Sequence, residues 1–325
     1  MSPYPERPIL AESQGFISIA WLLNSISPFM FPNFLPSNVT QLSEKTSIEL
    51  AASLQQAPVT IPSSSKPIQT CFVQQGENNT PILLLHGFDS SIMEFRRLLP
   101  KLANRRETWA IDLLGFGFTG RLVDLTYNTD NIKAHLKAFW EKMINRPVVL
   151  AGVSMGGATA IDFALTYPDI VESLVLIDSA GLAKPPSLKN IMFPPLDRLA
   201  TLFLANAWVR KSVSRNAYYD KTFVNEDSLI CTSLHLPCPF WSEALISFTK
   251  NGGYASFTEK LPRLSQPTLI LWGDCDQILG TKDAEKFQDL VPNSKLVWLE
   301  DCGHIPHLEK PKETADHIID FLEFA

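Results

Sequence analysis

The sequence lacks a cysteine framework. Only five cysteines are spread over 325 residues, and none forms a Cys-x-x-Cys pair or stands at a zinc-ligand spacing from a histidine. A disulfide scaffold and a structural zinc site are therefore excluded, and we expect no metal and no cofactor. Long basic runs are missing as well, since the longest is the pair Arg105-Arg106 and the formal net charge is -6. Without a basic face for phosphate groups, nucleic acid is not an expected partner.

A secretory leader is not expected either. Such a leader needs a basic start, a continuous apolar stretch and a small-residue cleavage site, whereas residues 1–15 contain Arg7 as their single base. We therefore expect a cytoplasmic protein. Apolar residues make up 45% of the chain and charged residues 19%, a balance that excludes a disordered chain, a collagen-like repeat and a polytopic membrane protein.

Charge is absent from residues 13–43, a segment that contains Trp21 and several phenylalanines. Pro28, Pro32 and Pro36 interrupt any helix there, and the apolar part is shorter than the roughly 20 residues that a transmembrane helix needs. Two alternatives remain: the segment packs on the main domain, or it makes peripheral contact with a membrane surface. We assign residues 1–66 to this N-terminal apolar arm and to a linker rich in proline and serine.

Residues 67–183 and 263–325 alternate short β-like runs with helical runs. This alternation predicts an α/β fold, in which helices cover both faces of a mostly parallel sheet. The later β-like runs are rich in valine, isoleucine and leucine without polar alternation, as expected when both faces of the sheet are buried. The expected strands are residues 69–73, 82–86, 108–112, 148–153, 174–178, 268–272 and 295–299, and the expected helices are residues 92–102, 129–143, 155–167, 282–290 and 312–321.

Residues 184–262 interrupt this alternation and are expected to form a helical cap. They hold 11 aromatic side chains, more than a small helical unit can bury internally, so some should line a cleft shared with the sheet domain. The candidate substrate-binding residues are Phe116 of the core and Phe193, Trp208, Phe240 and Trp241 of the cap.

The most specific local motif is a Gly-x-Ser-x-Gly sequence at residues 152–156, GVSMG. It follows a strand-like run and precedes a helical one, which is the context of a nucleophile elbow: a sharp turn exposes the serine oxygen, and the glycines let backbone come close. The following helix would place its positive end and free N–H groups beside Ser154. A bare match also occurs in ordinary turns, but this context favours Ser154 as a nucleophile.

A serine nucleophile needs a base and an acid that orients the base. Asp274 and Asp276 follow the strand-like run TLILWG, and His304 follows the run KLVWLE. Because successive parallel strands end at the same edge of a sheet, these loops are expected to meet at Ser154. We predict His304 as the general base and Asp276 as the acid. Asp274 and Asp178, which ends another strand, remain alternatives for the acid.

Acyl transfer also needs N–H donors for the oxyanion. Gly87 allows a turn directly after the predicted strand 82–86, so the backbone N–H groups of Phe88 and Met155 are predicted to form the oxyanion hole. His86 is expected to support that loop rather than to act as a base.

The segments HGF, DLLGFGFTGR, GVSMGGATA, LWGDCDQI and GHIPHLEKP, in this order, resemble the α/β-hydrolase superfamily over residues 67–325. The resemblance implies a mostly parallel sheet of about eight strands with a cap inserted after the sixth strand. More narrowly, HGFDSSIMEFRRLLPKL, ETWAIDLLGFGFTGR and FTKNGGYAS resemble cyanobacterial and plastid hydrolases of the chlorophyll dephytylase and pheophytinase type. That narrower resemblance implies cleavage of a phytyl ester of chlorophyll or a derivative, at the thylakoid membrane.

These observations favour a serine-dependent hydrolase that acts on a bulky hydrophobic small-molecule ester. A generic lipase or carboxylesterase with the same triad is one alternative. Hydrolysis of a carbon-carbon bond is another, which polar or basic cap residues in the pocket would favour. A non-catalytic binding protein on the same scaffold is a third alternative, against which the intact triad and oxyanion loop argue.

Cys275 and Cys302 stand next to the predicted acid and close to the predicted base. Their loops are expected to lie close together, so that oxidation of the two thiols would distort the triad. The alternative is that both are inert loop residues, because no neighbouring charge would clearly lower a thiol pKa.

Overall fold

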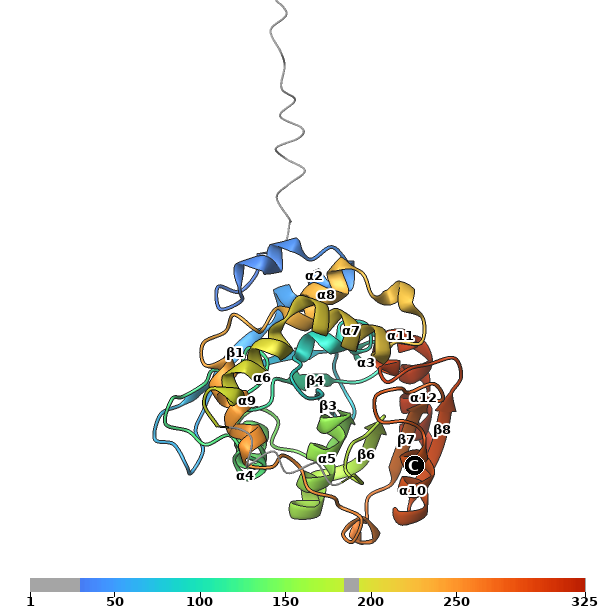
Figure 1. Cartoon of the computed structure of the whole chain (residues 1–325). Helices are drawn as coiled ribbons and strands as arrows, with labels where there is room; N and C mark the ends of the chain where they lie inside the picture. Colours follow the sequence, from blue (N-terminus) through green and yellow to red (C-terminus); the bar gives the residue numbers. More distant parts are fainter. Residues whose placement is uncertain (1–29, 184–192, 325) are drawn as a thin grey trace, which may run out of the picture. The chain divides into compact units, whose positions relative to one another are not determined.

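The computed structural model describes residues 30–183 and 193–324. Its strands are β1 (Gln55–Val59), β2 (Ile68–Gln75), β3 (Ile82–Leu85), β4 (Thr108–Ile111), β5 (Val148–Val153), β6 (Val171–Ile177), β7 (Thr268–Gly273) and β8 (Ser294–Leu299). They form one eight-stranded sheet in the order β1-β2-β4-β3-β5-β6-β7-β8 (Figure 1). Strand β2 is antiparallel to β1 and β4, and the other neighbouring pairs are parallel. The predicted α/β fold with a mostly parallel sheet is confirmed.

The central strands are buried on both faces. Strands β3, β5 and β7 consist of buried residues only, and their sequences ILLL, VVLAGV and TLILWG have no polar alternation. The edge strand β8 differs, because it also contains exposed and half-buried side chains. The parallel strands end at one edge of the sheet, and the residues predicted for the active site follow these ends.

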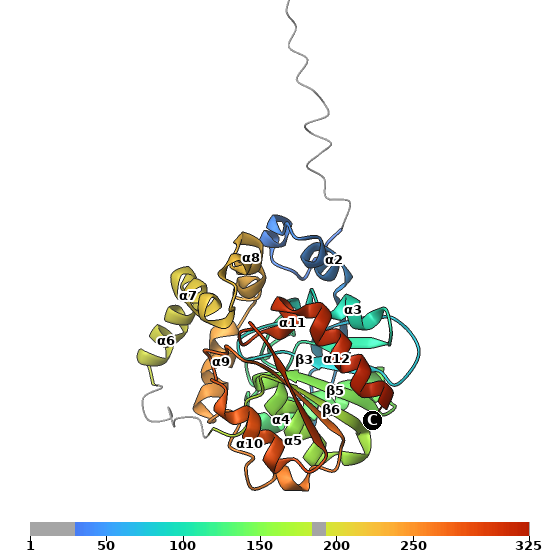
Figure 2. The same cartoon turned by 90° about the vertical axis from the view of Figure 1, so that its right-hand side faces the viewer.

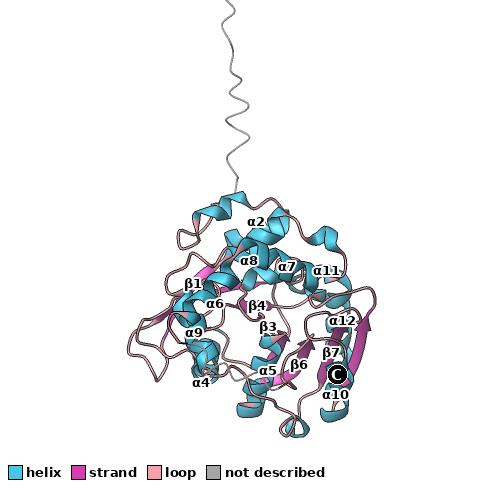
Figure 3. Cartoon of the chain, in the orientation of Figure 1, coloured by secondary structure: helices cyan, strands magenta, loops and turns pink. Residues whose placement is uncertain are grey.

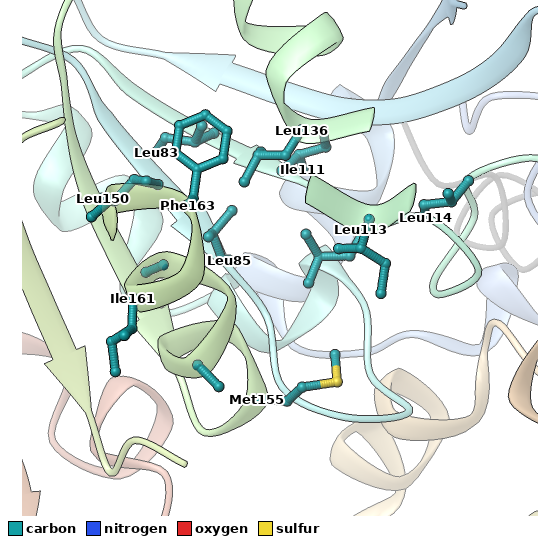
Figure 4. Close-up of a cluster of buried hydrophobic side chains, with 14 of the residues drawn as sticks. Leu83, Leu85, Ile111, Leu113, Leu114, Leu136, Leu150, Met155, Ile161 and Phe163 are labelled. Carbon is teal, nitrogen blue, oxygen red and sulfur yellow. The ribbon is translucent and has the colours of Figure 1, made fainter. Parts of the chain in front are cut away.

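Alternate side chains of the strands belong to two hydrophobic layers. In β3, Leu83 and Leu85 belong to one layer, and Ile82 and Leu84 belong to the other. Figure 4 shows the first layer, in which the two β3 leucines lie beside Phe163. The helices of the first layer include α4 (Thr129–Met143), α5 (Met155–Thr166) and α10 (Lys282–Leu290), and those of the second include α2 (Lys45–Ser53), α3 (Leu99–Ala103) and α12 (Pro311–Phe324).

The chain ahead of β1 also packs on the sheet. The 3-10 helix η1 (Ser37–Gln41) and helix α2 bury Val39 and Leu50 in the second layer. The backbone N–H groups of Ser43 and Glu44 donate to Asp227 Oδ1 at 2.6 and 2.8 Å. Residues 31–43 of the predicted arm therefore follow the packing alternative, whereas residues 13–29 lie outside the described part of the chain.

Strand β1 lies within the segment that was expected to be a linker. In its sequence QQAPV, Ala57 and Val59 are buried at alternate positions and Pro58 between them is exposed. A proline is tolerated there because β1 is an edge strand, whose outer side needs no ladder hydrogen bond. Pairing with β2 makes this segment a strand, and the local sequence does not show that pairing.

The chain between β6 and β7 forms the cap, defined here as residues 193–262. Its helices are α6 (Leu196–Ala205), α7 (Ala207–Ala217), α8 (Glu226–Ser233) and α9 (Trp241–Lys250), with the 3-10 helices η4 (Lys221–Phe223) and η5 (Leu261–Arg263). Figure 3 shows that helices and loops build this region, as expected from its sequence. The remaining short elements are η2 (Ile92–Phe95), η3 (Pro168–Ile170) and α11 (Pro306–Glu309). No helix within the described ranges is both long and apolar enough to cross a bilayer.

Candidate active site

Ser154 lies in a strained turn between β5 and α5. Its backbone has φ 51° and ψ -117°, a conformation that non-glycine residues rarely adopt outside functional sites. The Ser154 N–H donates to the Ile177 carbonyl at 3.0 Å, which ties the turn to β6. A Cβ atom at Gly152 would collide with the carbonyl of Gly156, and a Cβ atom at Gly156 would collide with that of Leu85. The two motif glycines are therefore required by close backbone packing.

His304 and Asp276 come together from the loops after β8 and β7. His304 Nδ1 lies 2.8 Å from Asp276 Oδ2, and both side chains are buried. Asp276 Oδ1 accepts the N–H groups of Ile278 and Leu279 at 2.7 and 3.1 Å. Burial by itself would raise the pKa of Asp276, but the hydrogen bond and charge of His304 together with the N–H groups of Ile278 and Leu279 outweigh it, so the pKa lies below its ordinary value. An ionised Asp276 can thus orient His304 and stabilise its protonated form.

The other two candidate acids have different partners. Asp274 Oδ1 accepts the N–H of Cys302 at 3.2 Å and so connects two loops. Asp178 is fully buried and accepts the N–H of Gly273 at 3.0 Å, while no hydrogen bond to its second oxygen occurs among the described residues. Burial and the neighbouring charge of Asp276 raise the pKa of Asp178 well above its ordinary value. Of the two neighbouring carboxyl groups, Asp178 is therefore the one that ionises less readily.

The predicted oxyanion loop follows β3, and hydrogen bonds of His86 fix its position. Leu113 N–H donates to His86 Nε2 at 3.0 Å, which leaves the ring proton on Nδ1 to be donated to the Gly87 carbonyl at 2.7 Å. Burial lowers the pKa of His86 to about 4, so the ring is neutral. His86 thus occupies the supporting position expected for it. Phe88 and Met155 line one cavity with Ser154, and the first N–H of helix α5 has no intrahelical partner.

Two cavities meet at Ser154. The first, which we call the Tyr254 cavity, has a volume of about 330 Å³, and the second, the Val213 cavity, has a volume of about 310 Å³. Phe88 and Ser154 line both of them. The Tyr254 cavity is further lined by Met155, Ala158, Ala180, Gly181, Phe248, Tyr254 and Leu279, and the Val213 cavity by Glu94, Leu204, Val209, Arg210, Val213, Tyr218 and His304. Within the described chain, Ser154 and His304 share the Val213 cavity without a hydrogen bond between their side chains.

The aromatic residues predicted to bind substrate lie elsewhere. Phe116 is buried behind the oxyanion loop, with its ring centroid 6.0 Å from that of Phe88. Phe193, Trp208 and Phe240 are exposed on the cap, and Trp241 is buried and donates its indole N–H to Asp89 at 2.8 Å. Aliphatic side chains such as Val209 line the Val213 cavity instead, together with polar and charged ones such as Glu94. Composition indicated an apolar cleft, but helix orientation decided which apolar residues face it.

Asp89, directly after Phe88 with its predicted oxyanion N–H, was not singled out from the sequence. Its carboxylate is buried and receives three cap side chains: Arg210 of α7 at 2.8 Å, Trp241 of α9 at 2.8 Å and His235 at 3.2 Å. Burial alone would raise the pKa of Asp89, but the hydrogen bonds and charges of His235 and Arg210 lower it to about 2. The charged Asp89 joins the cap to the oxyanion loop. A positive φ of 48° at this residue is visible only in the structure.

Glu94 is a second carboxyl group under the oxyanion loop that the sequence analysis missed. Its Oε1 accepts the N–H of Gly87 at 3.1 Å, and the residue lines the Val213 cavity. Burial raises the pKa of Glu94 to about 7. A single glutamate in the sequence IMEF carries no motif that could have revealed this position.

Cys275 and Cys302 lie in adjacent loops, as expected. The Cys275 N–H donates to the Cys302 carbonyl at 2.9 Å, and both thiols are free. Burial raises the pKa of both thiols, with nearby acidic groups adding to the effect. Neither thiol is therefore activated as a thiolate, which favours the alternative of inert loop residues.

A family model described as "alpha/beta hydrolase fold" matches residues 80–311 of the chain. The chain belongs to the α/β-hydrolase family. Among curated proteins of this kind, the Arabidopsis thaliana "Alpha/beta hydrolase domain-containing protein VTE7" is 31% identical over 305 residues, which are 90% of each chain. A 2-hydroxy-6-oxo-6-(2'-aminophenyl)hexa-2,4-dienoic acid hydrolase from Metapseudomonas resinovorans is 27% identical, over 78% of this chain and 88% of that protein.

A solved structure described as a membrane phospholipase A also has the α/β-hydrolase arrangement. It superimposes with a TM-score of 0.69 at 26% identity, covering 83% of this chain and 86% of its own. One of these relatives is thus named as a dienoic acid hydrolase and another as a phospholipase, so the proteins similar to this chain act on different substrates.

Proposed function

We propose that the protein is a serine-dependent carboxylic ester hydrolase for an ester with two bulky apolar parts. Ser154 Oγ attacks the ester carbonyl while His304 takes its proton, and Asp276 stabilises the resulting imidazolium. The N–H groups of Phe88 and Met155 stabilise the oxyanion. His304 then gives the proton to the alcohol oxygen, the ester bond breaks, and water hydrolyses the acyl-Ser154 intermediate by the same steps in reverse.

The observation that carries this proposal is the position of Ser154 at the junction of two cavities. An ester places its carbonyl carbon between an acyl group and an alcohol, so a nucleophile between two separate cavities fits a substrate that is large on both sides. His304 lines the Val213 cavity only, and the group that it protonates is the leaving alcohol. The alcohol therefore belongs in the Val213 cavity and the acyl group in the Tyr254 cavity.

Within this substrate class we propose a phytyl ester of chlorophyll or of a chlorophyll derivative. Phytol is a long apolar alcohol, and the Val213 cavity presents Leu204, Val209 and Val213 to it. The narrower resemblance of the sequence points to the same ester. A membrane-dissolved substrate of this kind would also explain a peripheral membrane contact.

The proposal is tested by assaying the wild-type protein and Ser154→Ala on chlorophyll a, pheophytin a and a short p-nitrophenyl ester. Ser265→Ala is the matched control, because Ser265 is exposed and lies away from both cavities. We expect the wild type and the control to release phytol and Ser154→Ala to be inactive on all three substrates. Turnover of the short ester alone would overturn the pigment assignment, and failure of a fluorophosphonate to label Ser154 would overturn the hydrolase proposal.

Hydrolysis of a carbon-carbon bond is the second candidate, and Arg210 is the observation that favours it. This cap residue brings a cationic side chain to the wall of the Val213 cavity, where it could bind a carboxylate of a dienoic acid. Its guanidinium is already occupied by Asp89 at 2.8 Å and by backbone carbonyls, which weakens the argument. Cleavage of a ring-opened dienoate at a higher kcat/KM than any ester would favour this candidate over the esterase.

A further inference from the structure

Helix α6 of the cap exposes its apolar face, the face that an ordinary surface helix buries. Leu196, Leu199, Leu202 and Phe203 recur at the spacing of one helix face, and their side chains are 46%, 55%, 67% and 62% exposed. The buried positions of the helix include Asp197 instead. An amphipathic helix of a globular protein normally turns its leucines toward the core, but no residue within the described ranges covers the apolar face of α6.

Polar contacts hold α6 in this orientation. The buried carboxylate of Asp197 pairs with Lys250 of α9 at 2.8 Å. Thr201, also buried, shares a hydrogen bond of 2.7 Å with Ser242, which lies on α9 like Lys250. These directed contacts fix which face of α6 meets α9, so the exposure of its leucines is built into the cap.

The exposed apolar face continues beyond α6. Phe193 precedes the helix, and Trp208 and Val213 lie on α7, which follows after the single residue Asn206; Trp208 is 75% exposed. Figure 2 shows α6 and α7 on the outer side of the cap, away from the strands. We define the cap apolar face as Phe193, Leu196, Leu199, Leu202, Phe203, Trp208 and Val213. An apolar surface of this extent on one protein chain marks an interaction site.

The exposed charged side chains on α6 and α7 have one sign. Between residues 193 and 217 the exposed charged side chains are Arg198, Lys211 and Arg215, and the acid of this stretch, Asp197, is buried and paired. The chain as a whole carries a net charge of -6, so this basic cluster is local. Leucine, phenylalanine and tryptophan bordered by cations are the composition of a surface that binds anionic lipid.

The cap apolar face is continuous with the active site. Val213 is 53% exposed and also lines the Val213 cavity, together with Ser154 and His304. Leu204 at the end of α6 and Val209 of α7 line the same cavity. A surface that covers α6 and α7 therefore lies against one wall of the cavity that holds the candidate nucleophile and base.

We propose that the cap apolar face docks on a lipid surface that carries anionic head groups. The side chains of Leu202 and Phe203 enter the apolar boundary of the lipid layer, Trp208 lies at the head groups, and Lys211 contacts lipid phosphates. Docking in this orientation presents the Val213 cavity to molecules dissolved in the lipid. The docking itself does not depend on which bond the enzyme cleaves.

The test measures binding of the full-length chain to vesicles of phosphatidylcholine, with or without phosphatidylglycerol, by co-sedimentation. We expect Leu202→Asn to bind the anionic vesicles at least about tenfold more weakly, because the variant loses the free energy of transferring a leucine side chain from water into lipid. Lys211→Gln should bind them about fivefold more weakly, with little change on neutral vesicles. Val123→Asn is the matched control, because Val123 is an equally exposed apolar residue of the core and its loss should change nothing.

Activity on a soluble short ester shows that each variant is folded, since Leu202 and Lys211 line neither cavity. Ser154→Ala should bind vesicles like the wild type, so a failure of the proposed esterase activity would be distinguished from a failure of docking. Equal vesicle binding by Leu202→Asn and the wild type would overturn the proposal. A lipid-free dimer that Leu202→Asn dissociates would assign the cap apolar face to a second copy of the chain and would also overturn it.

Discussion

Helix α5 of the core and helix α6 of the cap are similar in length and both are rich in apolar residues, yet they use these residues in opposite ways. Helix α5 lies against the sheet and buries nine of its residues, including Phe163. Helix α6 buries Asp197 and Thr201 and exposes Phe203 on its other face. In the core, removal of apolar side chains from water determines how a helix packs, whereas paired polar groups determine it in this part of the cap.

The same contrast separates the two halves of the candidate active site. Ser154, Asp276 and His304 come from turns that the sheet and close backbone packing hold in place. The cap reaches this site through the buried carboxylate of Asp89, which contacts α7 and α9. Substitutions in the core and in the cap test this contrast.

Asp276→Asn should have the largest effect. Asparagine cannot stabilise the imidazolium and favours the wrong tautomer of His304, so kcat on a soluble ester should fall about ten-thousandfold while the fold persists. The measurement is kcat together with circular dichroism. Asp274→Asn and Asp178→Asn are the controls and should keep kcat within about tenfold of the wild type. A ten-thousandfold loss in Asp178→Asn instead would transfer the role of the acid to that residue.

Two phenylalanine truncations compare α5 of the core with α6 of the cap directly. Phe163→Ala should lower the free energy of unfolding by about 3–5 kcal/mol, because it leaves a cavity in the packed layer against β3. Phe203→Ala should change it by less than about 0.5 kcal/mol, because the ring is 62% exposed. Urea unfolding of both variants measures these differences. Equal destabilisation would show that α6 is packed like a core helix and would contradict the difference between α5 and α6.

Asp89→Asn should weaken the attachment of the cap. The change leaves the guanidinium of Arg210 without its counter-charge and should cost about 3 kcal/mol of stability. We expect proteolysis within residues 193–262 before the core is cut, and a KM that rises more for a bulky ester than for a short one. Lys312→Gln, which breaks the exposed pair with Asp316, is the control and should cost less than about 1 kcal/mol. Cleavage in the core first would contradict the prediction.

Glu94→Gln should make the protein more stable at high pH. Because burial raises the pKa of Glu94 to about 7, ionising this carboxyl costs free energy in the folded state alone. The cost is absent near the ordinary glutamate pKa of 4.5, increases as the pH rises, and is fully present above about 7. The variant should therefore match the wild type near pH 4.5 and exceed it by about 2–3 kcal/mol above pH 7. Thermal unfolding across this pH range measures the difference, with Glu313→Gln, an exposed change, as the control.

Much of the core could be predicted because its signals are local. The bounds of β5, α4 and α10 agree with the expected ranges 148–153, 129–143 and 282–290, since each is a continuous apolar run or a clear helical period. The order of Ser154, Asp276 and His304 along strand ends also predicted which loops would meet. Strand β1 was missed because QQAPV has two buried side chains, and only pairing with β2 orders it.

Local sequence patterns were enough to predict the fold class, the elbow at Ser154 and a carboxyl partner for His304. The spacing of apolar residues and the position of glycines act over a few residues, so they can be recognised before the chain folds. Only the tertiary structure decided that Asp276 rather than Asp178 touches His304, that Asp89 receives the cap, and that Phe203 faces outward. These outcomes depend on charges and surfaces that are far apart in the chain, and burial sets their energies only after folding has brought them together.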